Sequence, residues 1–132
     1  MVQLVPVALV AALAATAAIA FAGVSETVPT NLKIRNSAPA FHGKVKTDVP
    51  DCESDRRVKL FRAQFGKGTA PRELVGRTNS NRKGKWYVPA EPLLDGDYFA
   101  KAKQHIVNID GVLVRCEPDF SSTVRVGGGG PD

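Results

Sequence analysis

Apolar and polar side chains alternate with a period of two through the part of the chain from 41 to 126. Four runs show the alternation most clearly: Phe41–Val45, Arg57–Phe61, Lys85–Pro89 and Tyr98–Ala102. This rhythm is typical of antiparallel strands that bury one face, and no long stretch has helical spacing. Turn-forming pairs such as Asp95-Gly96 and Asp110-Gly111 separate the runs. The pattern predicts an all-β domain, a seven-stranded antiparallel β-sandwich.

The segment "SNRKGKWYVP", Ser80 to Pro89, combines three cations with the single tryptophan of the chain. We interpret Asn81–Gly84 as a turn in which Gly84 takes a positive φ, a conformation that glycine adopts readily. Trp86 then begins the next strand and is expected to point into the core together with Val88. The cations stand at the turn because turns are exposed to water.

Residues 1–22 carry no charged side chain and are rich in alanine, and they end in Ala20-Phe21-Ala22. This composition indicates a secretory signal peptide cleaved after Ala22, and therefore a secreted, extracellular protein. The start of the chain lacks the usual Lys or Arg, so the alternative is an uncleaved membrane anchor. We expect residues 23–40 to form a linker or N-terminal arm, 41–126 the sandwich, and 127–132 a flexible glycine-rich tail.

The chain has two cysteines, Cys52 and Cys116. In an oxidising compartment an even number of cysteines favours a disulfide, and neither residue belongs to a CxxC pair that would indicate a metal site. A bridge between them would close a loop of about 65 residues and stabilise the fold by about 4 kcal/mol on the chain-entropy model. The alternative is a pair of buried free thiols.

The formal net charge is +5, and many of the cations lie between positions 56 and 85. Several of them are expected to share the outward face of neighbouring strands, which would suit an anionic extracellular polymer or another surface protein. Export argues against nucleic acid as a partner, and a membrane is expected only if the N-terminal segment is uncleaved. A solvated face without a ligand is the alternative. The candidate residues for an anionic-ligand face are Arg57, Lys59, Arg77, Arg82, Lys83 and Lys85.

The order of several short motifs resembles that of secreted bacterial carboxypeptidase regulatory-like domains, which belong to the transthyretin-like and Cna-B-like sandwich group. The motifs are "FHGKV" at Phe41–Val45, "TNSNRKGKW" at Thr78–Trp86, "LLDGDYFAK" at Leu93–Lys101 and "SSTVRV" at Ser121–Val126. The resemblance implies a transthyretin-like or Ig-like sandwich that serves as an accessory, adhesive or stalk module. It says little about a specific activity, because fold does not determine function.

No converging set of catalytic residues is evident in the sequence. His42 and His105 are isolated, and neither belongs to a known metal-ligand spacing. We therefore predict a non-catalytic module without cofactor or metal, with a binding, adhesion or structural role at the cell surface. One alternative is a small metal-binding protein or metal-dependent enzyme centred on His42 and His105. Another is a subunit of a surface assembly, in which the Phe41 edge or the N-terminal arm pairs with a neighbouring sheet.

Overall fold

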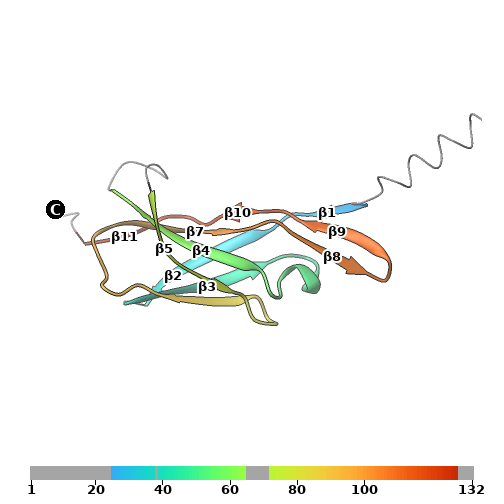
Figure 1. The fold of residues 1–132 in the computed structure, drawn as a ribbon, viewed down its shortest axis with the longest axis horizontal. Coiled ribbons are helices and arrows are strands. Elements are labelled where there is room, and N and C mark those ends of the chain that lie inside the picture. Colours follow the sequence, from blue (N-terminus) through green and yellow to red (C-terminus); the bar gives the residue numbers. More distant parts are fainter. Residues whose placement is uncertain (1–24, 38, 65–71, 128–132) are drawn as a thin grey trace, which may run out of the picture.

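The computed structural model describes residues 25–37, 39–64 and 72–127. Within them it contains eleven β-strands and a short 3₁₀-helix, arranged as in Figure 1. The elements are β1 (Glu26–Val28), β2 (Asn31–Ser37), β3 (Ala40–Lys46), η1 (Pro50–Cys52), β4 (Arg57–Ala63), β5 (Arg72–Asn79), β6 (Lys85–Pro89), β7 (Gly96–Ala102), β8 (His105–Ile109), β9 (Val112–Cys116), β10 (Asp119–Phe120) and β11 (Val124–Val126). The predicted all-β fold is confirmed.

The strands form three sheets. Sheet A has the order β1-β9-β8, sheet B the order β2-β3-β6, and sheet C the order β10-β7-β4-β5, with β11 also pairing with β7. The prediction of seven strands is thus wrong for the described residues. The sequence pattern did not reveal β8. Its Ile106 is apolar but exposed, so the strand lacks the expected alternation of apolar and polar residues.

Sheets B and C face each other across the main core, which consists of apolar residues at alternate strand positions. Leu32, Phe41 and Val45 come from β2 and β3, whereas Leu60, Tyr98 and others come from β4 and β7. The rings of Phe41 and Tyr98 stack with their centroids 4.5 Å apart. The period of two in the sequence therefore arises as predicted, because every second residue of these strands lies between the two sheets.

The Asn81–Gly84 turn forms as the sequence predicts. Gly84 has φ +81° and donates its N–H to the Asn81 carbonyl at 2.9 Å. The side-chain oxygen of Asn81 accepts two further backbone N–H groups, from Lys83 and Lys85. Trp86 is buried beside Val88 in the main core.

Residues 23–40 are not a linker or loosely attached arm where the structure describes them. β1 pairs in parallel with β9, and β2 pairs with β3 along its whole length. Pro29 and Pro39, which indicated irregular chain, stand between strands and do not interrupt them. The prediction that the Phe41 edge pairs with a neighbouring sheet is also wrong. β3 lies between β2 and β6, so it has no free edge for a neighbouring molecule.

The predicted signal peptide at 1–22 and the glycine-rich tail beyond Gly127 lie outside the described residues. In the part of the chain that the structure describes, no helix is both long enough and apolar enough to cross a membrane.

Sheet A extends from one end of the sandwich and has its own small core (Figure 1). This core contains Val28, Val114 and the two cysteines, which are joined by a disulfide with the Cα atoms 5.5 Å apart. The bridge ties η1 to β9 and confirms the predicted pairing.

Arg56 lies beside the disulfide and is fully buried. Its guanidinium donates to the carbonyl oxygens of Lys103, Cys52 and Glu117 at 2.8–2.9 Å, and to the hydroxyl of Thr30 at 3.1 Å. Three of these acceptors, in Thr30, Lys103 and Glu117, lie in segments that are distant from Arg56 in the sequence. Arg56 therefore connects sheet A to the main sandwich at the same junction that the disulfide crosses.

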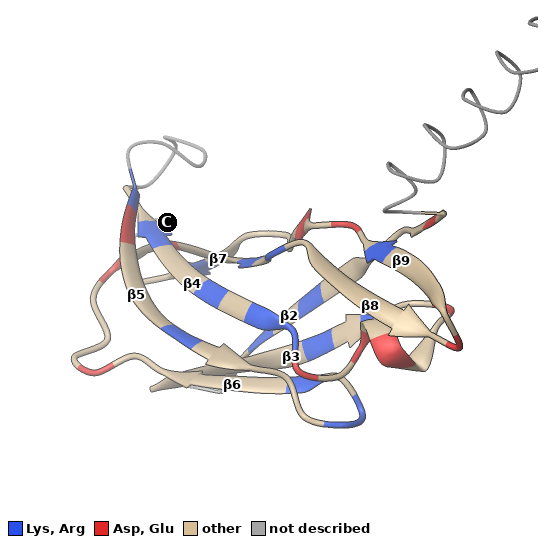
Figure 2. Ribbon diagram, turned by 45° about the vertical axis from the view of Figure 1, so that its right-hand side comes forward, with Lys and Arg blue, Asp and Glu red and all other residues tan. Residues whose placement is uncertain are grey.

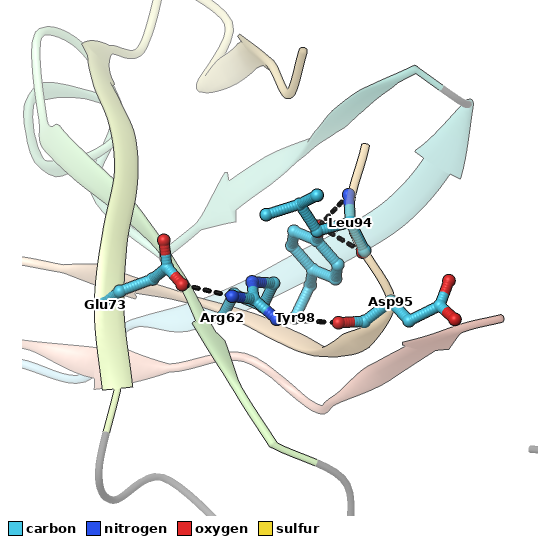
Figure 3. A network of polar contacts seen from close by, with 5 residues as sticks. All are labelled: Arg62, Glu73, Leu94, Asp95 and Tyr98. Carbon is cyan, nitrogen blue, oxygen red and sulfur yellow. Dashed lines mark hydrogen bonds and ion pairs between the residues drawn. The ribbon is translucent and has the colours of Figure 1, made fainter. Parts of the chain in front are cut away.

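A buried tyrosine fastens the other end of the sandwich (Figure 3). The hydroxyl of Tyr98 donates to the Leu94 carbonyl at 2.6 Å and accepts the Leu94 N–H at 3.1 Å. These two hydrogen bonds hold the connection between β6 and β7 against the start of β7. The same arrangement is known from tyrosine corners in sandwich domains. Burial raises the pKa of Tyr98, so the hydroxyl keeps the proton that it donates.

Candidate functional site

Five cations gather on the outer face of sheet C. Lys59, on the central strand β4, lies directly opposite Arg77 of β5 on one side and Lys101 of β7 on the other. Arg57 precedes Lys59 on the same face of β4, and Lys103 follows β7. We call these residues, Arg57, Lys59, Arg77, Lys101 and Lys103, the sheet C patch.

The electrostatics of the patch are unbalanced. Repulsion from Lys103 lowers the pKa of Lys59 most, and desolvation, Arg77, Arg57 and Lys101 lower it further. Every charge acting on Lys59 in this way is positive. An anion placed over the patch would relieve this repulsion, because it would interact favourably with all five cations at once.

Two other cations of sheet C, Arg62 and Arg125, are neutralised within the chain. Arg62 forms an ion pair with Glu73 and also donates to the Asp95 carbonyl at 2.7 Å (Figure 3). Arg125 pairs with Asp97 at 2.9 Å. Among the described residues, no carboxylate forms a comparable ion pair with a member of the sheet C patch. The charge of the patch is therefore available to a ligand.

An aromatic row adjoins the patch on the same face. Phe99 lies between Phe61 and Phe120, with centroid distances of 5.5 Å and 6.0 Å. Phe99 is buried, whereas Phe120 is 45% exposed. The Lys101 ammonium lies 5.4 Å from the Phe120 ring, so the row and the cations form one continuous surface.

The structure brings together only part of the predicted anionic-ligand face. Arg57, Lys59 and Arg77 share the sheet C patch. Arg82 and Lys83 lie instead in the exposed turn between β5 and β6, and Lys85 faces outward from sheet B. Sequence reasoning missed Lys101 and Lys103. The available signal was that Lys101 alternates with the buried Ala100 and Ala102, which assigns it to the outward face of β7.

The two histidines lie in different sheets, His42 on β3 of sheet B and His105 on β8 of sheet A. Within residues 25–37, 39–64 and 72–127, no group of three or more His, Cys, Asp or Glu side chains is placed to hold a metal ion. The geometry therefore offers no support for a metal centre built from His42 and His105.

Comparison with known proteins gives little further information. No model of a known protein family matches the chain, and no curated protein matches it. Among solved structures, the chain is similar to pectate lyase Pel3 from Pectobacterium carotovorum, with 18% identity and a TM-score of 0.34. The similarity covers 78% of this chain but 28% of the lyase chain. A likeness at this level carries no argument about fold or function.

Proposed function

We propose that this chain is a non-catalytic module that binds an anionic polysaccharide of the extracellular space on the sheet C patch. The observation that carries the proposal is the position of Lys59, which has four other cations around it and, among the described residues, no carboxylate paired with it. Natural protein surfaces usually mix the two signs of charge, so an unbalanced group of this kind suits a ligand that brings the missing negative charge.

The shape of the patch favours a polymer over a small ion. Four of its five members come from three adjacent strands, which are spaced about 4.8 Å apart in a sheet. The cations therefore form an extended, open surface. The aromatic row beside them offers the exposed ring of Phe120, which suits the apolar face of a sugar.

The disulfide-locked sandwich gives this surface a rigid support. An extracellular accessory role also agrees with the resemblance to carboxypeptidase regulatory-like domains, and with the apolar segment at 1–22.

A matched pair of variants tests the proposal. Lys59→Gln with Arg77→Gln removes one Lys and one Arg from the patch, whereas Arg82→Gln with Lys83→Gln removes the same charge from the exposed β5–β6 turn. Titration with dextran sulfate is expected to show about tenfold weaker binding for the patch variant and less than about threefold for the turn variant. Neutral dextran of the same length should not bind.

Three results would contradict the proposal. Equal weakening by the two variants would mean that only net charge matters. Binding of dextran sulfate that does not weaken as salt is raised would exclude an electrostatic site. Tighter binding of duplex DNA than of dextran sulfate, with loss in the patch variant, would assign the patch to a nucleic acid instead.

A further inference from the structure

A second group of cations lies on the outer face of sheet B. Lys44, on the central strand β3, is directly opposite Lys33 of β2 and Lys85 of β6. The neighbouring row across the same strands consists of Arg35, His42 and Tyr87. Because residues opposite each other in a sheet point to the same face, both rows face the solvent side of sheet B.

The face is hollowed into a groove of about 640 Å³, which we call the sheet B groove. Basic side chains dominate its lining, and none of the described residues that line it carries a carboxylate. The basic residues of the lining are Lys33, Arg35, His42, Lys44, Lys46 and Lys85.

Gly43 allows the strands to approach closely at the floor of this groove. A Cβ atom at this position would overlap the Lys33 carbonyl oxygen and would lie 2.8 Å from Nε1 of Trp86. Gly43 therefore lets the backbones of β2 and β3 pack closely beside Trp86, while Lys33, Lys44 and Lys85 form a row of like charge on the opposite face of the same strands. Such a concentration of like charge raises the electrostatic potential of the groove.

The sheet B groove and the sheet C patch lie on opposite sides of the molecule. Sheets B and C pack face to face through the main core, so their outer faces point away from each other. Figure 2 shows Lys and Arg on β2 and β3 as well as on β4 and β5.

Acidic residues separate the two surfaces at two of the connections between the sheets. The β3–β4 connection carries Asp48, Asp51, Glu53 and Asp55, and the β6–β7 connection carries Glu91 and Asp95. A polyanion passing from one face to the other over these connections would meet repulsion. The β5–β6 turn, which carries Arg82 and Lys83 and no acidic residue, is a third path, along which one polymer chain could wrap around the molecule.

We propose that the sheet B groove is a second, weaker site for the same class of anionic polysaccharide, and that the protein cross-links two polymer chains. The inference rests on the proposed function, since it adds a second site to the first. Each face holds one chain, and the acidic connections keep the two chains apart. A secreted module of this kind would act as a bridge within an anionic polymer layer.

The experiment uses a surface that carries dextran sulfate. The protein is bound to the surface, and fluorescent dextran sulfate is then added as a second layer. The wild type is expected to capture the second layer. The comparison is with the triple variant Lys33→Gln, Lys44→Gln, Lys85→Gln. This variant is expected to bind the first layer with an affinity within about threefold of the wild type, but to capture about tenfold less fluorescent dextran sulfate.

The Arg82→Gln, Lys83→Gln variant distinguishes bridging from wrapping. It should still capture the second layer; loss of capture in this variant would show that one chain wraps over the turn, and would overturn the inference. If the wild type binds the first layer but captures no second layer, bridging is wrong while the proposed function stands. If no first layer binds at all, the proposed function itself fails. Circular dichroism of each variant checks that the sandwich is intact.

Discussion

Replacing Arg56 with methionine will lower the free energy of unfolding by at least about 3 kcal/mol. Methionine fills much of the space of the arginine side chain but cannot donate a hydrogen bond. The carbonyl oxygens of Lys103, Cys52 and Glu117 would lose the donor that now satisfies them at 2.8–2.9 Å. Because Arg56 is fully buried, water does not replace these bonds without opening the junction.

The adjacent residue supplies the control. Arg57 is exposed and makes a single side-chain hydrogen bond, to Asn79 at 3.1 Å. Arg57→Met is therefore expected to change stability by no more than about 0.5 kcal/mol. Arg56→Lys keeps the charge but lacks the planar fork, so most of the loss should remain. Chemical denaturation with the disulfide intact measures all three, and equal midpoints for the two methionine variants would refute the role of Arg56.

Removing the disulfide by Cys52→Ala with Cys116→Ala is expected to cost about 4 kcal/mol of stability. The two residues are 64 positions apart, so the unfolded chain gains much freedom when the bridge is absent. Both sulfurs are buried in the small core of sheet A, so the variant also loses packing there.

Denaturant unfolding of the double variant, and of the wild type with and without reductant, provides the measurement. The reduced wild type should resemble the double variant. An unfolding midpoint of the double variant equal to that of the oxidised wild type would show that the bridge does not hold the fold. Arg56 and the disulfide fasten the same junction, so their losses are not expected to be additive.

Local features of this chain could be predicted from the sequence. The alternation around Phe41, Leu60 and Tyr98 is a direct consequence of lying between two layers, and Gly84 has the positive φ that its turn requires. The disulfide followed from counting cysteines. Each of these depends on a few neighbouring residues or on composition.

Features that depend on strand order could not be predicted. The pairing of Lys44 with both Lys33 and Lys85 follows from β3 lying between β2 and β6, and a single sequence does not state that order. The same is true of Lys101, which joins Lys59 only because β7 is the neighbour of β4. The sequence therefore showed an excess of cations but not the two faces on which they gather.

Arg56 illustrates the same difficulty for the core. In the sequence it is one of many cations and resembles a surface residue. It is buried because the nearby Cys52 carbonyl and the distant Lys103 and Glu117 carbonyls converge on its guanidinium, after η1 and the ends of β7 and β9 have met. Such a partner set exists only in the folded chain, so no local pattern reveals it.

We propose that both outer faces of the sandwich, and not its connections, bind an anionic polymer. Backbone chemical-shift mapping by nuclear magnetic resonance during titration with dextran sulfate tests it most directly. The largest changes are expected at Lys59 and Lys101 on one face and at Lys33 and Lys44 on the other, with small changes at the Asp110-Gly111 turn. Changes confined to Arg82 and Lys83, or spread evenly over all exposed cations, would contradict it.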